Sequence, residues 1–329
     1  MQPFTFHVVD DLAAARAALL AEPDAKLIAG GTTLIDLMKA GVETPPVVVD
    51  INRLPLRTIE LRPDGSLRIG ALARNSDVAD DPTVAARFPL LAQALNAGAS
   101  GQLRNMATVG GNLLQRTRCT YFREPAARCN RRAPGSGCDA LEGYNRAHAI
   151  LGTSPHCIAT HPSDMAVALV ALDAQVAIAG DGGERRVRCE DFFLQPGERP
   201  DRENALAPGE LIVAVELPAQ PFGVRARYLK LRDRAAYEFA LVSVAAAIDV
   251  TDGTIRAARL ALGGVATVPW RAHAAEAVLA GAAANATTFA AAADAVLRGA
   301  IPRQHNAFKI ELARRAIVRT LRGLCEVSR

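Results

Sequence analysis

The stretch from residue 116 to residue 157 constrains the fold most, because it has no helical or strand periodicity and yet carries four of the chain's six cysteines. A stretch of this length without regular structure is uncommon inside a compact domain unless a ligand orders it. A chain of 329 residues buries a large core and does not need a disulfide framework. Clustered cysteines in such a chain favour a metal site over scattered structural thiols. The four cysteines are Cys119, Cys129, Cys138 and Cys157.

The spacing of these cysteines, C-x9-C-x8-C-x18-C, lacks the closely spaced pairs of zinc modules and the short spacings of ferredoxins. Four thiolates still suit a tetrahedral sulfur site, either for zinc or for a [4Fe-4S] cluster. The alternative is a set of free, buried cysteines. His148, His156 and His161 flank the last cysteine. Because four cysteines already complete a site, we expect these histidines to be hydrogen-bonding loop residues.

The charge around the cysteines is strongly positive. Residues 113–157 contain seven arginines and three acidic residues, a local net charge of +4 that equals the formal charge of the whole chain. Such arginines would stabilise an anionic thiolate cluster and raise its potential. They would also suit a solvated basic loop or a surface that docks an acidic partner. A charge of +4 over the whole chain does not by itself indicate a nucleic-acid-binding protein.

Regular structure is predicted on both sides of this stretch. Residues 4–50 show strand, helix, strand, helix and strand patterns in turn, which is typical of a small α/β unit. Residues 57–71 predict a β-hairpin and residues 75–98 predict helical structure. After the cysteines, a helix from about Ser163 precedes a strand. Three antiparallel strands are predicted within residues 225–265, followed by alanine-rich helices. The last of these helices is predicted to place Ile310, Ala313, Ile317, Leu321 and Leu324 on one apolar face.

Half of the residues are hydrophobic, but no apolar run is long enough to cross a bilayer. The apolar segment 12–21 is preceded by Asp10 and Asp11 and is interrupted by Arg16, which is unlike a signal peptide. We therefore expect a soluble protein without direct membrane insertion. The expected location is the cytoplasm, or the periplasm if a signal-bearing partner subunit is exported together with it.

Two glycine-containing loops are candidate phosphate sites. AGGTTL at 29–34 lies between a predicted strand and a predicted helix, and ATVGGN at 107–112 offers a similar arrangement. Glycines let backbone amides approach an anion, although tight turns also use glycine pairs for steric reasons alone. Neither loop matches the G-x-G-x-x-G or P-loop motif. The sequence shows no Ser-His-Asp, paired-carboxylate or H-E-x-x-H pattern, so no catalytic residue is predicted.

Five sequence blocks resemble, in this order, the FAD-binding subunit of the xanthine dehydrogenase and molybdenum aldehyde oxidoreductase family: KLIAGGTTL, RNMATVGGN, PSDMAVALVALDA, GELIVAVELP and YLKLR. The resemblance spans nearly the whole chain. It implies an α+β fold, with a two-part FAD-binding domain of the vanillyl-alcohol-oxidase/PCMH type followed by an α+β C-terminal domain that contains a three-stranded antiparallel sheet and helices. The implied domains are residues 1–220, with an insert at about 113–160, and residues 221–329, with the boundary near 219–223.

The resemblance also implies which residues contact FAD. The first glycine loop would hold the pyrophosphate, and the second would contact the phosphates and the ribityl chain. Asp164 would contact the sugar-side hydroxyls, Leu211 or Ile212 would lie near the isoalloxazine, and Lys230 would contact the flavin. The implied FAD residues are Lys26, Leu27, Ile28, Ala29, Gly30, Gly31, Thr32, Thr33, Leu34, Thr108, Gly111, Asn112, Asp164, Ile212 and Lys230.

The cysteine-bearing insert departs from most of the family, in which the second glycine block is followed almost directly by the SD block. Here 51 residues separate Asn112 from Asp164. A subset of the family has such an insert with an additional [4Fe-4S] cluster, and LLQRTRCTYFR resembles the periplasmic-type aldehyde oxidoreductases of that subset. The resemblance therefore implies iron rather than zinc, with four metal ligands: Cys119, Cys129, Cys138 and Cys157.

The function implied by the resemblance is electron transfer in a heterotrimeric molybdenum hydroxylase that oxidises aldehydes. The implied partners are a molybdopterin-binding catalytic subunit and a [2Fe-2S] subunit, and FAD would pass electrons to an external acceptor. Alternatives within the family are the FAD subunit of a hydroxybenzoyl-CoA reductase or of a xanthine dehydrogenase-like enzyme. More distant alternatives are a stand-alone flavin reductase, which would purify without a large partner, and a zinc-stabilised basic module that binds nucleic acid or protein.

Overall fold

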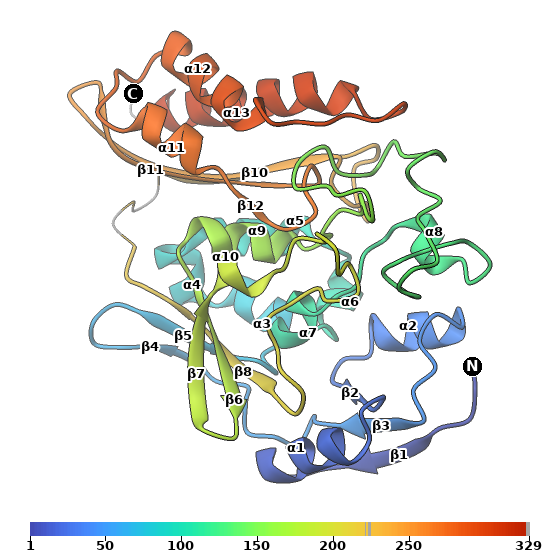
Figure 1. Cartoon of the computed structure of the whole chain (residues 1–329). Coiled ribbons are helices and arrows are strands. Elements are labelled where there is room, and N and C mark those ends of the chain that lie inside the picture. The colour runs from blue at the N-terminus through green and yellow to red at the C-terminus, as the bar shows by residue number, and fades with distance from the viewer. Residues whose placement is uncertain (221, 223–224, 327–329) are drawn as a thin grey trace.

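The computed structural model describes residues 1–220, 222 and 225–326. Three sheets follow one another along the chain (Figure 1). A three-stranded sheet contains the N-terminal residues, a five-stranded sheet follows, and a four-stranded sheet carries the C-terminal helices on one face. None of the described helices is long and apolar enough to cross a membrane.

The N-terminal unit has the predicted strand-helix-strand-helix-strand order. Its three strands are parallel, in the order β1-β3-β2. Asp11 caps the first helix, because its carboxylate accepts a hydrogen bond from the amide of Ala14 at 2.7 Å. Gly41, with φ +71°, lies just after the second helix. The elements are β1 (Thr5–Val8), α1 (Leu12–Ala21), β2 (Lys26–Ile28), α2 (Leu34–Lys39) and β3 (Val47–Asp50).

The second part is a five-stranded antiparallel sheet in the order β4-β5-β8-β6-β7, with helices packed on it. The helical segment predicted at 75–98 is three helices, because Pro82 and Pro89 each open a new one. Its strands are β4 (Ile59–Leu61), β5 (Leu67–Gly70), β6 (Gln175–Gly180), β7 (Gly183–Arg188) and β8 (Leu211–Leu217). Its helices are α3 (Asn75–Asp80), α4 (Pro82–Arg87), α5 (Pro89–Ala97), α6 (Gly101–Arg104), α7 (Val109–Leu113), α9 (Asp164–Ala171) and α10 (Cys189–Phe192).

The insert at 113–160 is almost entirely irregular, as its lack of periodicity predicted. Between α7 and α9 it contains a single short helix, α8 (Thr120–Arg123). Its loops lie beside the N-terminal unit and the C-terminal sheet, on the right of Figure 1. Arg132 holds the insert together by donating hydrogen bonds to backbone carbonyl oxygens of Tyr121, Phe122, Pro125 and Ala127.

The C-terminal part is an antiparallel sheet covered by three helices. Three strands were predicted, and a short fourth strand joins them, in the order β12-β11-β10-β9. The predicted boundary at 219–223 includes residues 221 and 223, which lie outside the described residues. The elements are β9 (Ala226–Leu231), β10 (Val242–Thr251), β11 (Thr254–Gly263), β12 (Trp270–Arg271), α11 (His273–Leu279), α12 (Ala286–Leu297) and α13 (Phe308–Glu326).

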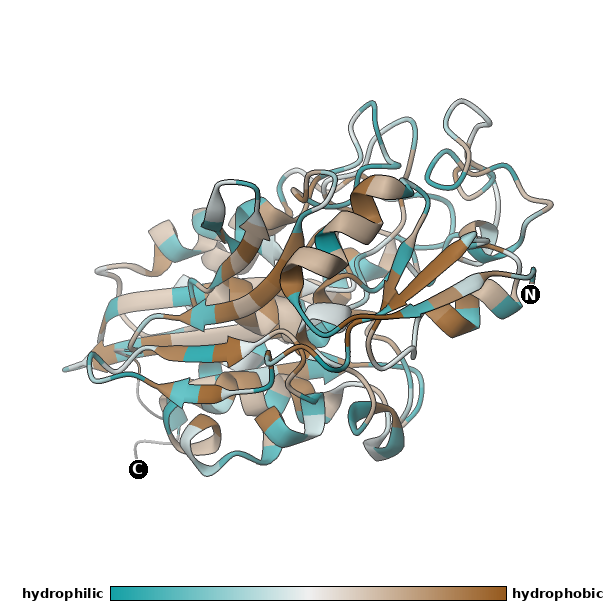
Figure 2. Ribbon diagram, turned by 90° about the horizontal axis from the view of Figure 1, so that it is seen from below, coloured by the Kyte–Doolittle hydropathy of each residue, from teal (hydrophilic) through white to brown (hydrophobic). Residues whose placement is uncertain are grey.

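Two large hydrophobic cores lie against these sheets. One includes α5, α9 and strands of the five-stranded sheet, and the other lies between the C-terminal sheet and α11, α12 and α13. Much of the hydrophobic colour in Figure 2 lies on strands and helices, consistent with these cores. The predicted apolar face of α13 is confirmed, since Ala313, Ile317, Leu321 and Leu324 are buried.

Candidate functional site

The first glycine loop connects β2 to α2 and leaves its backbone amides available. Among the described residues, the amides of residues 30–33 donate to no protein acceptor. Gly31 adopts φ +70°, a left-handed conformation of the kind found in anion-binding backbone nests. These amides can therefore hold an anionic group such as a diphosphate.

Gly30 has a packing role that sequence analysis missed. A Cβ atom on Gly30 would lie 1.8 Å from the carbonyl oxygen of Met106, in the segment that leads into the second glycine loop. The sequence pattern predicts that this glycine allows close approach of the backbone to an anion. The structure adds that the two glycine loops can only pack against each other if residue 30 has no side chain.

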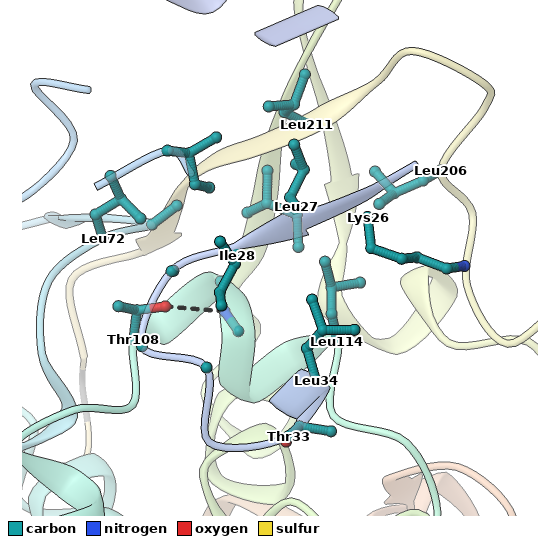
Figure 3. Close-up of a pocket in the computed structure, with 18 of the residues that line it drawn as sticks. Lys26, Leu27, Ile28, Thr33, Leu34, Leu72, Thr108, Leu114, Leu206 and Leu211 are labelled. Carbon is teal, nitrogen blue, oxygen red and sulfur yellow. Dashed lines mark hydrogen bonds between the residues drawn. The ribbon is translucent and has the colours of Figure 1, made fainter. Parts of the chain in front are cut away.

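The second glycine loop is fixed by hydrogen bonds on both sides. The hydroxyl oxygen of Thr108 accepts a bond from the amide of Gly111 at 3.2 Å and so caps α7 (Figure 3). The Gly110 amide donates to the carbonyl oxygen of Ala71 at 2.8 Å. The Ser163 hydroxyl donates to Oδ1 of Asn112 at 2.6 Å, which ties this loop to the start of α9.

Two adjoining cavities meet at the glycine loops, and we call them the first lobe and the second lobe. Their volumes are about 440 Å³ and about 470 Å³, and Thr32, Thr33 and Gly111 line both. Figure 3 shows the first lobe, with Lys26 and other residues of β2 facing the loop that carries Leu206. Cavities of this size are typical of cofactor sites, and an elongated ligand can occupy both lobes.

Every predicted FAD residue lines one of the lobes. The first lobe is lined by all of Lys26–Leu34 and by Thr108, Gly111 and Ile212. The second is lined by Thr32, Thr33, Gly111, Asn112, Asp164 and Lys230. Ile212, which was expected near the isoalloxazine, and Lys230, which was expected to contact the flavin, therefore lie in different lobes. The structure brings the residues together, and their contact with FAD stays a prediction.

Asp164 and Lys230 form a buried ion pair at the second lobe. The Lys230 Nζ lies 2.7 Å from Oδ2 of Asp164, and their side chains are 4% and 8% exposed respectively. Tyr228 donates its hydroxyl to Oδ1 of Asp164 at 2.6 Å. Burial, reinforced by the Asp164 carboxylate, raises the pKa of Tyr228 well above its usual value, so the phenol stays protonated. Lys230 also donates to the carbonyl oxygen of Ala97, which joins α5, α9 and β9.

The second lobe also presents polar atoms that sequence analysis did not find. Asn75 is buried and lines the lobe, and its Oδ1 has no hydrogen-bond partner among the described residues. The same holds for Nε of Arg118, whose guanidinium stacks over the ring of Phe239 at 5.0 Å. A buried polar atom without a partner is costly unless a ligand or water satisfies it. These atoms fit a ligand with polar edges, such as a flavin.

The four cysteines line a single cavity of about 10 Å³. Cys129 and Cys138 face each other across an antiparallel bridge, and Cys119 immediately precedes α8. All four thiols are free. Within residues 1–220, 222 and 225–326, no group of three or more histidine, cysteine, aspartate or glutamate side chains is arranged to hold a metal ion. The predicted ligands therefore share one cavity, which we call the cysteine site, and metal binding there stays a prediction.

Hydrogen-bond donors surround the sulfur atoms. The Nε2 atom of His148 lies 3.1 Å from Sγ of Cys119. Sγ of Cys157 accepts from the guanidinium of Arg131 at 3.7 Å and from the amide of Ala159 at 3.4 Å. Burial raises the pKa of Cys119 to about 12, so a thiolate there depends on such donors or on a bound cation. Donors to sulfur commonly accompany metal-bound thiolates.

Among the described residues, His156 and His161 form no hydrogen bond with a cysteine sulfur. His156 lies 3.0 Å from the carboxylate of Glu198. His161 packs edge-on against Phe193, and burial lowers its pKa to about 3, so it is neutral. The expected hydrogen-bonding role therefore suits these histidines.

All seven arginines of the insert are engaged within the chain. Arg132 binds backbone carbonyl oxygens, and the other six form ion pairs. Because these arginines are already paired, they do not form a free basic surface for an acidic partner. The pairs are Arg116 with Glu43 and Glu203, Arg118 and Arg123 with Asp36, Arg128 with Asp139, Arg131 with Glu203, and Arg146 with Asp233.

Comparison with known families accounts for nearly the whole chain. Residues 2–220 match the family described as the FAD binding domain in molybdopterin dehydrogenase. Residues 227–324 match the family described as the CO dehydrogenase flavoprotein C-terminal domain. The chain belongs to the family of FAD-binding subunits of molybdopterin dehydrogenases. The predicted fold class, a FAD-binding part followed by an α+β C-terminal part, is confirmed.

This FAD-binding subunit has relatives among oxidoreductases. It is 51% identical over 322 residues to the aldehyde oxidoreductase FAD-binding subunit PaoB of Escherichia coli (strain K12), covering 98% of each chain. It is 28% identical to the xanthine dehydrogenase FAD-binding subunit of Escherichia coli O157:H7, covering 91% of this chain and 87% of that one. The solved carbon monoxide dehydrogenase from Hydrogenophaga pseudoflava matches it with a TM-score of 0.78 and 29% identity, covering 99% of both chains. The chain is therefore an oxidoreductase subunit, as predicted.

Proposed function

We propose that this chain is the FAD-carrying electron-transfer subunit of a molybdenum-containing aldehyde oxidoreductase. The observation that carries the proposal is the 51% identity to an aldehyde oxidoreductase FAD-binding subunit over 98% of both chains. Identity to the xanthine dehydrogenase subunit is only 28%, which favours aldehydes over purines as the substrates of the complex. Both relatives are named as FAD-binding subunits, which agrees with substrate chemistry on a partner subunit.

We further propose that FAD occupies both lobes. The amides of residues 30–33 would hold its pyrophosphate, and Asp164 and Lys230 would orient the flavin in the second lobe. Bound FAD supplies the exchange of electrons between an iron–sulfur partner and an external acceptor. The chain's own residues bind it, fix its orientation and set the charges around it. The unpartnered Oδ1 of Asn75 and Nε of Arg118 support a ligand in the second lobe.

The cysteine site is proposed to hold a [4Fe-4S] cluster. Four free thiols line one cavity, Arg131 donates a hydrogen bond to Sγ of Cys157, and Nε2 of His148 lies 3.1 Å from Sγ of Cys119. Such donors favour the thiolate form and raise the potential of a cluster. The cluster would be this chain's own metal centre, in addition to the [2Fe-2S] centres of a partner.

The proposed partners are a molybdopterin-binding catalytic subunit and a [2Fe-2S] subunit, and the electrons leave the complex to an external acceptor. Relatives at 51% and 28% identity are each named as the FAD-binding subunit of an oxidoreductase, which supports such an assembly. We propose the domain division at residues 1–220 and 221–329, since the two family matches end and begin at 220 and 227.

A spectroscopic analysis of the purified complex tests the function. We expect a flavin absorbance with one FAD per chain, about four irons beyond those of the [2Fe-2S] partner, and bleaching of the flavin when an aldehyde is added. A chain that purifies alone and reduces a substrate with a nicotinamide cofactor would contradict the proposal. Zinc in place of iron would contradict the cluster and leave the flavin function standing.

A further inference from the structure

Arg131 lies between the cysteine site and the first lobe. One of its terminal nitrogens donates to Sγ of Cys157 at 3.7 Å, and the other pairs with the carboxylate of Glu203 at 3.0 Å. The side chain is only 6% exposed. The guanidinium is therefore a buried cation whose two partners lie in two different sites.

From Glu203 the contacts continue along the wall of the first lobe. The Oε1 atom of Glu203 accepts from Nε of Arg116 at 2.6 Å. Arg116 also pairs with Glu43, whose carboxylate lies 3.7 Å from Nζ of Lys26. All four of these residues line the first lobe. A chain of alternating charges thus runs from the cysteine site to Lys26, the first residue of β2, which leads into the first glycine loop.

The first lobe needs these arginines if it is to hold an anion. Its lining includes two cationic side chains, Lys26 and Arg116, but four carboxylates. An anionic diphosphate would be repelled by this excess unless cations behind the wall neutralise it. The carboxylates and their additional partners are Glu203 with Arg131, Asp201 with Arg199, Glu210 with Arg185, and Glu43 with the Lys26 and Arg116 already named.

We propose that Arg131 and Glu203 couple occupancy of the cysteine site to the affinity of the first lobe for FAD. This inference rests on the proposed function, because it requires a cluster at the cysteines and FAD in the lobes. When Cys157 is a cluster-bound thiolate, it holds Arg131 in place against Glu203. The charged side chains of the first lobe are then already arranged to bind a diphosphate before FAD enters. Without the cluster, Cys157 still contacts Arg131, but a free thiol accepts a weaker hydrogen bond than a cluster-bound thiolate, so Arg131 and Glu203 are less constrained.

A double-mutant cycle on FAD affinity tests this coupling in the full-length chain co-produced with its partner subunits. Cys138→Ser removes the cluster and leaves intact Cys157, which contacts Arg131. Glu203→Gln removes the charge of the link without changing its size. We expect Cys138→Ser to raise the Kd for FAD by about 5–20-fold in the otherwise unaltered chain. In the Glu203→Gln background, the same change should raise the Kd by no more than about twofold.

Asp233→Asn is the matched control. It removes a carboxylate charge from the ion pair with Arg146, which joins the insert to the segment after β9 at 2.7 Å and does not line the first lobe. In this background, Cys138→Ser should raise the Kd for FAD by the same factor as in the unaltered chain. An effect of equal size in the Glu203→Gln background would overturn the coupling.

Iron analysis separates failure of the coupling from failure of the proposed function. An unaltered complex without iron at the cysteine site would overturn the proposed cluster together with the coupling and leave the flavin function standing, whereas iron with equal Kd factors in all backgrounds would overturn the coupling alone. If Cys138→Ser does not fold, iron loss to a chelator provides the reciprocal measurement, because coupled sites stabilise each other equally. Saturating FAD should then slow iron loss in the unaltered and Asp233→Asn chains but not in Glu203→Gln, and equal slowing in all three would overturn the inference.

Discussion

Replacement of Lys309 by methionine tests how the insert is attached to the C-terminal part. Lys309 is fully buried near the start of α13. Its Nζ donates to the carbonyl oxygens of Ala147 at 2.9 Å, His148 at 3.0 Å and Gly264 at 2.7 Å. An ammonium has three protons, so the charged form satisfies all three carbonyls. Methionine keeps most of the volume and removes every one of these bonds.

The cost of this change follows from two opposing terms. Hydrogen bonds from a charged donor contribute about 1.5–3 kcal/mol each. Burying the ammonium costs several kcal/mol, and the same burial lowers the pKa of Lys309 to about 7. In the variant, three buried carbonyls lose their donor. Each carbonyl left without a donor costs about 1–3 kcal/mol, and the variant no longer buries a charge, so we expect Lys309→Met to lower the free energy of unfolding by about 3–5 kcal/mol.

Urea unfolding of the full-length chain measures this loss through the fluorescence of its single tryptophan, Trp270. Lys39→Met, at the exposed end of α2, is the matched control and should change the free energy of unfolding by no more than about 0.5 kcal/mol. FAD content should remain normal, because Lys309 lines neither lobe. Equal urea midpoints for the Lys309 and Lys39 variants would refute the reasoning.

Three further predictions follow from other sites. Hydrogen bonds from Arg186 and two more arginines hold the pKa of Glu216 at about 2, below its usual 4.5. This carboxylate therefore stabilises the folded state above pH 4.5, and the stabilisation is lost as the pH falls toward 2. In urea unfolding, Glu216→Gln should reduce the change in the free energy of unfolding between pH 4.5 and pH 2 by about 3 kcal/mol. Gly30→Val should abolish FAD binding, and normal flavin absorbance in that variant would contradict the loop assignment. Cys119→Ser and Cys138→Ser should each remove the cluster's iron and keep one FAD per chain at saturating FAD, whereas joint loss of iron and flavin would show that the insert supports the flavin fold.

Local patterns in the sequence were enough to predict most of the elements. The hairpin turn at Asp64-Gly65 and the apolar face of α13 depend on neighbours in sequence, and both are present. Strand β7 was not predicted, because its sequence GERRVR is polar and its residues are mostly exposed, so no alternation marks it. It is a strand because it pairs with β6 along its whole length, and such pairing is a tertiary property.

The candidate site divides in the same way. The four cysteines lie close together in sequence, and their grouping was predictable from spacing alone. The link between Arg131 and Glu203 was not, since these residues lie 72 positions apart in separate irregular segments. The sequence likewise could not predict that Oδ1 of Asn75 lacks a partner, because this depends on burial by the surrounding helices. Single polar residues of this kind carry no periodic signal, and tertiary packing decides what they contact.

The insert is held by contacts that do not involve the cysteines, and this bears on what the cysteine site does. Lys309 and Asn306 bind the backbone of residues 147–149, and Arg132 binds four carbonyl oxygens within the insert. A cluster is therefore not needed merely to attach the loop. A cavity of about 270 Å³ is lined both by Cys119 and by Asp164, which also lines the second lobe. The cysteine site is thus connected to the second lobe through this cavity, and to the first lobe through the buried guanidinium of Arg131, which pairs with Glu203. This placement favours a role in electron transfer or in tuning the flavin over a purely mechanical one.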